Sequence, residues 1–450
     1  MDKTTSRMAE TISTLRFDDF SPEVIHETKR RLLDSVGCAA GAFQYPLSQT
    51  MRDLAGREKG LPPARVWFTG AESTLDAAGL ANGTMVRYLD LSDTILSKAA
   101  GHPSDMIAAL VALAETLEAD GKTLITAIVA AYEAYGQLCD AVAFQKSGID
   151  QSTAAALGAA AGASHLLNLD QEQTGQALSL ALGANVNLYN VRQGALSDWK
   201  AIAGPNAARN GVFAAQMAAE GLSGPSAIFD GAYGLKHITG PFEFGSEGAQ
   251  RLRILDTHLK AYPVCYHGQS AVDAAMALTG KFAPEDIQTV RIETYDAAFL
   301  VMGNDGSRWA PKNRETADHS IPYVVGTVFM TGNLRPSDYD EESLNSPALQ
   351  DFLPKIEVRS SEAFSALYPG QARTRITVET RTGQIETSET LQPKGHVENP
   401  MSDEELVQKF DGLWPETFSD HGKSSILDRI WNIDTLDSVK ILVDALCDYN

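Results

Sequence analysis

The sequence predicts a mainly α-helical protein with a large all-helical domain and a smaller α+β domain that contains an antiparallel sheet. Ala and Leu at helical spacing dominate residues 4–250. After residue 260, short segments alternate between apolar and polar residues, which is typical of half-buried strands. Residues 402–447 return to a helical pattern, so we expect the end of the chain to rejoin the helical domain.

The first half of the chain reads as a series of helices separated by short loops. Stretches rich in Gly and Pro at residues 60–63 and 221–225 are typical of loops or caps. The strongest predicted helices cover residues 105–117, 123–142, 153–167 and 174–182.

The second half mixes helices with strands. Helical patterns cover residues 269–278 and 321–330. Strands are expected at residues 289–294, 355–359 and 373–380, followed by a returning strand around Ile385. Because helices interrupt the strands irregularly, this part resembles an α+β domain rather than a parallel βαβ series.

This change of pattern sets the domain boundaries that we expect. A chain of 450 residues exceeds the usual size of one core, and 44% hydrophobic residues can fill two. We place the helical domain at residues 1–256, with residues 397–450 returning to it through helices at 402–410 and 435–447. The α+β domain then covers residues 257–396.

The charge of the chain restricts its partners. With 37 basic and 58 acidic residues, the net charge is -21. This charge argues against a nucleic acid or an anionic membrane as partner. A small anionic substrate would need a locally cationic pocket, for which the candidates are Arg87, Arg192, Lys200 and Lys260.

The cysteines and the N-terminus indicate a reduced, cytoplasmic protein. The four cysteines are far apart and form no C-x-x-C pair, which argues against zinc ribbons, iron–sulfur clusters and a disulfide framework. Residues 1–10 lack an apolar segment, and no later run reaches the roughly 20 apolar residues of a membrane span. We therefore expect no export signal.

A dense group of polar residues suggests an active site. The segment RYLDLSDT (residues 87–94) and the segment HPSD (residues 102–105) lie in an otherwise apolar, helix-forming region. Ser104 is a natural N-cap for the helix that follows, which would leave His102 just outside a helix N-terminus. Such an end attracts carboxylates. The alternative is that Ser104 only caps the helix and that Asp90 and Asp93 only line a turn.

Two downstream segments, together with this one, resemble the MmgE/PrpD family. They are KAYPVCYHGQSAVDAA (residues 260–275) and WAPKNRETADHSIPY (residues 309–323), and the resemblance runs from about Met8 to the end of the chain. The family includes 2-methylcitrate dehydratase, cis-aconitate decarboxylase and iminodisuccinate epimerase. The resemblance implies a helical domain made from both ends of the chain, an α+β lid inserted between them, an active site at their junction near Lys260, and a homodimer.

The resemblance also implies catalytic roles in the first segment. Asp90, Thr94 and His102 match family positions that act in catalysis or bind substrate. Dehydration of a β-hydroxy acid needs a base, an acid and cationic stabilisation. His102 is the best candidate for the acid or base because an ordinary imidazole exists in both protonation states near neutrality. Asp90 would orient or polarise it, and Arg87 would help to hold a carboxylate.

Other matching positions supply cations and a phenol. Lys200 lies in DWKAIAGPNAARNG (residues 198–211) and would bind a substrate carboxylate, although a lysine in a loop is usually only solvated. Lys260 would be a second clamp or an activated acid, since burial would lower its pKa. Tyr323 matches an active-site aromatic residue and could donate a phenolic hydrogen bond. Its alternative role is ordinary core packing.

Two features relate the chain to the dehydratase members. His267 and Gln269 form an H-x-Q group that resembles those members, and His319 is a further, secondary candidate. Decarboxylase and epimerase members have a histidine at the position of Asp150. The dehydratases tend to have Asp-His there, whereas Asp150 is followed here by the neutral Gln151. We expect both residues to line the substrate site.

The sequence thus favours a cofactor-independent lyase that dehydrates a tricarboxylic or related hydroxy acid. Decarboxylation or epimerisation of a related polycarboxylate is the first alternative. A helical binding or scaffold protein that kept the fold and lost catalysis is the second, supported by Gln151. A metal hydrolase built on Asp90, Asp93 and His102 is the third, but it lacks a further ligand at suitable spacing. We therefore expect no metal ligands.

Overall fold

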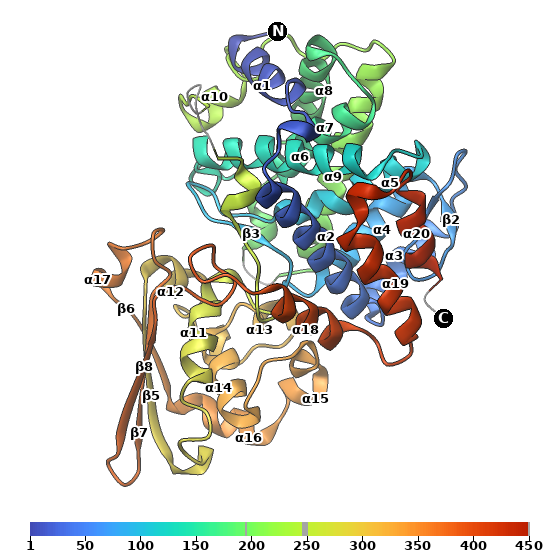
Figure 1. Cartoon of the computed structure of the whole chain (residues 1–450). Coiled ribbons are helices and arrows are strands. Elements are labelled where there is room, and N and C mark those ends of the chain that lie inside the picture. The colour runs from blue at the N-terminus through green and yellow to red at the C-terminus, as the bar shows by residue number, and fades with distance from the viewer. Residues whose placement is uncertain (194–195, 245–250, 449–450) are drawn as a thin grey trace.

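The computed structural model describes residues 1–193, 196–244 and 251–448, and within these ranges helices dominate. The mainly α-helical fold class expected from the sequence is confirmed. Figure 1 shows a large helical part, which carries both chain ends, and a smaller mixed part beside it. None of the helices in the described ranges has the length and apolar character needed to cross a membrane.

The helical part is built mostly from the first 240 residues and the last 50. Several helices begin at the side-chain caps that their sequences offer, such as Asp120 before α6 and the capping box of Asp170 and Gln173 before α8. The helices of this part are α1 (Lys3–Ser13), α2 (Pro22–Ala42), α3 (Pro46–Ala55), α4 (Leu75–Tyr88), α5 (Ile107–Thr116), α6 (Gly121–Ala141), α7 (Ser152–Leu166), α8 (Gln171–Ala184), α9 (Trp199–Ala219), α10 (Leu235–Thr239), α18 (Asp403–Leu413), α19 (Asp420–Trp431) and α20 (Lys440–Cys447). Two short antiparallel pairs complete it, namely β1 (Ala64–Arg65) with β2 (Glu72–Ser73), and β3 (Thr94–Ile95) with β4 (Thr257–His258).

Small residues allow the central helices to pack closely. The Ala-rich helix α7 is buried along almost its whole length and packs against α6 and α9. In α9, a Cβ atom at Gly204 would lie 1.8 Å from the Asp105 carboxylate. Only glycine therefore lets α9 approach the segment that carries His102, and this approach brings Lys200 to the same region.

The mixed part contains a four-stranded sheet with helices packed against it. The strand order is β6-β5-β7-β8. The elements are α11 (Tyr266–Met276), β5 (Ile287–Thr294), α12 (Asp296–Met302), α13 (Arg314–Ala317), α14 (Ile321–Thr331), α15 (Glu341–Leu344), α16 (Pro347–Phe352), β6 (Ile356–Ser360), α17 (Glu362–Ser365), β7 (Thr374–Thr380) and β8 (Ile385–Thr390). Helix α11 contacts β7 and β8, while α14 contacts β6 and α11 (Figure 1).

One strand pair differs from the fully antiparallel sheet that the sequence predicts. Strands β5 and β6 are parallel, whereas β5 with β7 and β7 with β8 are antiparallel. The connection from β5 to β6 runs through α12 to α16, which is long enough to return the chain in the same direction. Alternation of apolar residues identified the strands but carried no information on this direction.

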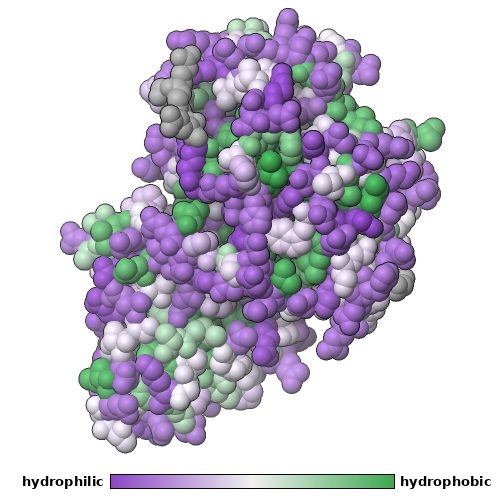
Figure 2. All heavy atoms as spheres, viewed as in Figure 1, coloured by the Kyte–Doolittle hydropathy of each residue, from purple (hydrophilic) through white to green (hydrophobic). Residues whose placement is uncertain are grey.

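Two large hydrophobic cores underlie the two parts, and a small third cluster lies among α3, α4 and α5. The larger one contains residues from Met8 to Leu259 and from Met401 to Leu446, so α18 to α20 pack with the N-terminal helices. The second contains residues from Val264 to Val378. On the face shown in Figure 2, hydrophilic residues predominate and hydrophobic ones form small scattered groups, as the charge of the chain suggests.

Two histidines pack together where the chain passes between the cores. The rings of His258 and His396 are stacked, with centroids 4.3 Å apart and 13° between the planes. His258 Nδ1 accepts a hydrogen bond from the Val397 amide at 3.2 Å, and His396 Nδ1 accepts one from the Glu398 amide at 3.1 Å. Burial lowers the pKa of both imidazoles, and for His258 the neighbouring His396 and Arg31 lower it further.

This pair makes stability depend on pH. Both pKa values in the folded state lie below the ordinary value of about 6.5. When the pH falls below that value, the two histidines bind protons in the unfolded chain but not in the folded chain. The free energy of unfolding should therefore decrease as the pH is lowered, by up to about 1.4 kcal/mol per pH unit for each histidine. Urea denaturation between about pH 7.5 and about pH 5 measures this slope.

The variant His396→Asn should reduce that slope, and replacement of the exposed His421 should not. An unchanged slope in His396→Asn would show that the stacked pair does not titrate with unfolding.

Candidate active site between the two cores

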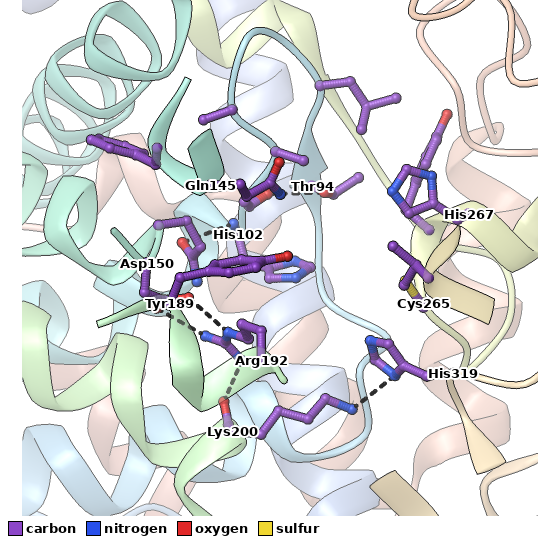
Figure 3. A pocket seen from close by; sticks show the side chains of 18 of the residues that line it. Thr94, His102, Gln145, Asp150, Tyr189, Arg192, Lys200, Cys265, His267 and His319 are labelled. Carbon is purple, nitrogen blue, oxygen red and sulfur yellow. Dashed lines mark hydrogen bonds and ion pairs between the residues drawn. The ribbon is translucent and has the colours of Figure 1, made fainter. Parts of the chain in front are cut away.

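A cavity lies between the two cores. Together with its open mouth it takes in about 820 Å³ of space that no protein atom fills. Its walls come from the helical part on one side and from the mixed part on the other, as Figure 3 shows. The lining residues are Arg87, Thr94, Leu96, Ala99, Ala100, Gly101, His102, Phe144, Gln145, Asp150, Gln151, Tyr189, Arg192, Leu196, Lys200, Cys265, Tyr266, His267, Val301 and His319.

Asp93 positions His102 on the helical wall. The backbone carbonyl of Asp93 lies 2.8 Å from His102 Nδ1, and because a carbonyl can only accept, Nδ1 carries the proton. The Asp93 carboxylate accepts hydrogen bonds from the Ser104 amide at 2.9 Å and the Tyr132 hydroxyl at 2.8 Å. Within the described residues, His102 Nε2 has no protein hydrogen-bond partner, so its lone pair is available to a ligand in the cavity.

The cap predicted at Ser104 is different in the structure. A 3-10 turn, Pro103–Met106, precedes α5, and the Ser104 hydroxyl has no hydrogen-bond partner in the described part of the chain. The carboxylate of Asp93 caps this end instead. The reason is spatial: Asp93 folds back over the turn, which local spacing alone does not reveal.

The surroundings of His102 favour its neutral form. Burial lowers the pKa of this imidazole well below its ordinary value, and the nearby cations Arg87 and Lys260 lower it further. A neutral imidazole with a proton fixed on Nδ1 and a free lone pair on Nε2 is suited to accept a proton from a ligand.

Asp90 is the centre of a buried charge network. Its carboxylate lies 3.0 Å from Arg87, 3.1 Å from Lys200, 2.5 Å from Lys260 and 3.9 Å from His319 Nδ1. Burial alone would raise the pKa of this carboxyl, but Arg87, Lys260 and Lys200 outweigh burial and hold it well below the ordinary value. Asp90 therefore stays ionised and acts as counter-charge to the surrounding cations.

The backbone at Asp90 is also unusual. Its φ of 50° lies in the left-handed region, which Asp and Asn tolerate better than other non-glycine residues. In this conformation, just after α4, the carboxylate and the backbone carbonyl of Asp90 both face Lys260. The Lys260 Nζ atom lies 2.8 Å from that carbonyl oxygen.

Three residues expected in the site lie behind the cavity wall. Lys260 is 1% exposed, and its ammonium is bonded to Asp90. The Gln269 amide bonds to backbone groups of Ala261, Tyr262 and Val264 and so fixes the chain after Lys260. The Tyr323 hydroxyl donates to the Asp338 carbonyl at 2.5 Å, inside the second core. Like these three, Asp90 is not part of the cavity wall itself.

The remaining predicted residues of the helical part do line the cavity. Thr94 donates its hydroxyl proton to the Gly101 carbonyl at 2.9 Å. Asp150 forms an ion pair with Arg192 at 2.9 Å. The guanidinium groups of Arg192 and Arg87 both line the cavity. Burial would raise the pKa of Asp150, but Arg192 outweighs it and lowers this pKa.

Gln151 has a positioning role in this wall. Its carbonyl oxygen accepts hydrogen bonds from the Tyr135 hydroxyl and, at 3.4 Å, from the His102 amide. Its amide nitrogen lies 3.5 Å from the Asp105 carboxylate, whose pKa burial raises to about 6. Gln151 thus connects the segment of His102 to the start of α7.

The opposite wall carries a thiol and two further imidazoles. Figure 3 shows Cys265, His267 and His319 together, facing His102 across the cavity. His319 Nδ1 lies 2.5 Å from the Asp318 carboxylate, which also binds the Lys200 ammonium at 2.8 Å. His267 Nδ1 lies 2.8 Å from the Tyr295 hydroxyl.

The two imidazoles of this wall differ in their electrostatics. Burial and Lys200 would lower the pKa of His319, but the Cys265 thiol and the Asp318 carboxylate outweigh them and raise it. In contrast, burial and the neighbouring His319 and Lys260 lower the pKa of His267 to about 4. His319 is therefore suited to carry a proton, and His267 to remain neutral.

One group of side chains has the spacing of metal ligands. Among the described residues, ligand atoms of Asp90, Asp318 and His319 lie within 4.8 Å of one another. The Lys200 ammonium already lies between these groups, 3.1 Å from Asp90 and 2.8 Å from Asp318. A divalent cation would have to displace it. In the described part of the chain, the alternative set of Asp90, Asp93 and His102 does not form such a group. One Asp93 oxygen accepts from the Ser104 amide and the other from the Tyr132 hydroxyl.

Sequence reasoning assigned no role to several residues of the site. Cys265 was noted only as one of four scattered cysteines, and Arg192 only as a cation. Tyr189 and Asp318 received no role, although Tyr189 lines the cavity and Asp318 joins Lys200 to His319. The Asp318-His319 pair was the one local signal, since a carboxylate beside an imidazole commonly orients it.

The fold and this cavity define a mainly helical protein with a cavity of imidazoles, carboxylates and cations between an all-helical part and an α+β part. Comparison with known families agrees with this description. The model of the MmgE/PrpD N-terminal domain matches residues 6–244, and that of the MmgE/PrpD C-terminal domain matches residues 262–433. The chain belongs to the MmgE/PrpD family.

Several relatives carry dehydratase names. The chain is 28% identical to a 2-methylcitrate dehydratase of Escherichia coli K12 over 382 residues, which cover 78% of this chain and 76% of the relative. It is 26% identical to a mitochondrial 2-methylcitrate dehydratase of Yarrowia lipolytica, with 82% and 74% covered. An alkylcitrate dehydratase of a fungal species is 27% identical, with 84% and 81% covered.

Proposed function

We propose that this protein is a cofactor-independent hydro-lyase that dehydrates a hydroxy tricarboxylate of the 2-methylcitrate type. The observation that carries the proposal is a pair of imidazoles, His102 and His319, on facing walls of one cavity, each with Nδ1 bound to an oxygen acceptor. The dehydratase names of the relatives support the reaction class.

His102 is the proposed base. Its neutral state and free Nε2 allow it to remove the proton from the carbon beside a substrate carboxylate. The backbone carbonyl of Asp93 holds the tautomer in place and stabilises the imidazolium that forms.

His319 is the proposed acid. Its raised pKa favours the protonated form, and Asp318 orients the ring through Nδ1. Proton donation from this side would convert the departing hydroxyl group to water. Two groups whose environments move their pKa values in opposite directions are a common basis for paired acid and base roles.

Cations of the wall are proposed to bind the carboxylates. Arg87, Arg192 and Lys200 line the cavity, and each is already oriented by an aspartate. Thr94 and His267 would add polar contacts. Lys260 has an indirect role in this proposal, because it fixes Asp90, which in turn positions Arg87 and Lys200.

Independence from metal ions is part of the proposal. The Lys200 ammonium provides the positive charge at the point where Asp90, Asp318 and His319 converge. Activity should therefore survive treatment with a chelator.

A second candidate is epimerisation of a related polycarboxylate. One neutral and one protonated imidazole on opposite sides of a carbon atom would also serve a two-base exchange of its proton. Asp150 and Gln151 hold the position where the resemblance expects a further imidazole in decarboxylase and epimerase members, and they are engaged by Arg192 and Tyr135. This departure counts against both reactions, and decarboxylation has no second observation in its favour.

The products formed by chelator-treated protein separate these reactions. With 2-methylcitrate, citrate and cis-aconitate as substrates in deuterated water, we expect new alkene absorbance without release of carbon dioxide. Deuterium incorporation without an alkene would favour epimerisation, and carbon dioxide would favour decarboxylation. Absence of all three signals on every substrate would contradict the proposal and favour a non-catalytic relative.

We also propose a homodimer and a cytoplasmic setting. All four cysteines are unpaired, which suits a reducing compartment. The large hydrophobic side chains Trp199 and Phe213 of α9 are 45% and 50% exposed, and a second copy could cover them. One relative is named as mitochondrial, so that compartment is the alternative.

A further inference from the structure

The thiol of Cys265 lies in the cavity but has no part in the proposed acid–base chemistry. Cys265 is the N-cap residue of α11, and its amide donates to the Asp318 carbonyl at 3.0 Å. This bond places the thiol beside His319 in the cavity wall, opposite His102 (Figure 3). The cysteine therefore belongs to a Cys265–His319–Asp318 group rather than standing alone.

This group resembles an activated thiol. Asp318 binds His319 Nδ1 at 2.5 Å, so the other edge of the ring is available to the sulfur and to a ligand. Burial would raise the pKa of the Cys265 thiol, but His319 outweighs it and lowers this pKa. The N-terminus of α11 acts in the same direction.

The other three cysteines provide an internal comparison. Cys38 and Cys139 are buried in the larger core, where burial raises the pKa of each thiol. Burial also raises the pKa of Cys447 to about 11. Selective reaction at Cys265 is therefore expected, because the thiolate is the reactive form of cysteine.

We propose that Cys265 is a covalent capture site for α,β-unsaturated carboxylates that the cavity binds. The inference rests on the proposed function only for the class of ligand, since dehydration of a hydroxy acid yields such an alkene. The cations Arg192 and Lys200, which line the same cavity from the helical part, would hold the carboxylates while the alkene faces the sulfur.

The addition is balanced without any further reactant. In the pair with protonated His319 the sulfur is a thiolate, which forms a bond to the β-carbon of the alkene. The π electrons of the double bond move to the α-carbon, which then takes the proton from His319 and leaves this imidazole neutral. The net reaction adds S–H across the double bond and leaves a thioether that carries the carboxylates of the ligand.

The test uses maleate as an anionic alkene and its uncharged diamide as the matched control. After incubation of the full-length protein with each compound, peptide mass spectrometry locates and quantifies adducts. We expect the maleate adduct on Cys265 to form about tenfold or more faster than on Cys447 and faster than the diamide adduct. Tricarballylate, a saturated tricarboxylate, should slow it by occupying the cavity.

Two variants separate capture from mere exposure of the thiol. Cys265→Ser should abolish the adduct, and His319→Gln should slow its formation by about tenfold or more while the protein keeps its circular dichroism spectrum. Equal labelling of Cys447, equal rates with maleate and its diamide, or labelling of Cys265 by iodoacetamide but not by maleate would each overturn the inference.

Dehydratase activity is measured separately on the untreated protein. An adduct on Cys265 in a protein that dehydrates none of the substrates would support this inference and contradict the proposed function. Dehydration without any adduct would contradict this inference alone.

Discussion

Replacement of His102 by glutamine is expected to lower kcat by about 10²- to 10⁴-fold, the usual contribution of a general base. Glutamine can still donate a hydrogen bond to the Asp93 carbonyl, which His102 Nδ1 now contacts at 2.8 Å, so the turn should keep its conformation. It offers no basic nitrogen to the cavity. Steady-state rates of alkene formation measure the loss, and calorimetry should show tricarboxylate binding changed by less than about threefold.

The matched control is His165→Gln. His165 is a partly buried histidine whose Nε2 lies 2.7 Å from the Ile12 carbonyl, outside the cavity. It should leave kcat unchanged. A His102→Gln enzyme that retains more than about one tenth of the wild-type kcat would exclude His102 as the base.

The pH dependence of the wild-type enzyme gives an independent readout of the same assignment. The base must be neutral and the acid protonated, so kcat/KM should fall at low pH with His102 and at high pH with His319. Because the pKa of His102 is lowered and that of His319 is raised, these limbs should lie on opposite sides of about pH 6.5. His102→Gln should lose the acidic limb.

Local sequence patterns were sufficient to predict the helices, the strands and part of the site. Helical spacing predicted α6, α7 and α14 to within a few residues. Residues 87–102 converge because they follow one another along the chain, and backbone hydrogen bonds between Ile95 and Gly101 close the segment. This closeness along the chain explains why Arg87, Thr94 and His102 all line the cavity.

Long-range contacts explain what the sequence did not reveal. Tyr323 lies four residues after His319, but α14 begins between them and the Tyr323 ring lies in the second core, where it stacks on Tyr339. The Cys265 amide meets the Asp318 carbonyl from a distant part of the chain. No spacing rule predicts such a contact, which depends on how α11 packs beside α14.

Replacement of Asp90 by asparagine is expected to destabilise the protein by about 3–5 kcal/mol, the usual cost of breaking a buried ion pair on one side. The change leaves Arg87, Lys200 and Lys260, which are all nearly inaccessible to solvent, without their shared counter-charge. Asparagine is the appropriate substitution because it tolerates the positive φ of 50° at this position. Urea denaturation at neutral pH measures the free energy of unfolding.

Asp428→Asn serves as the control, since Asp428 is 60% exposed in its ion pair with Arg429 and should change stability by no more than about 1 kcal/mol. A second replacement, Lys260→Met, separates charge from shape. If the surplus of buried positive charge causes the loss, adding Lys260→Met to Asp90→Asn should restore about 1–3 kcal/mol relative to the sum of the single changes. Strict additivity would mean that the unpaired Lys260 ammonium does not cause the loss, and the surplus of charge at Lys260 would then be excluded as its origin.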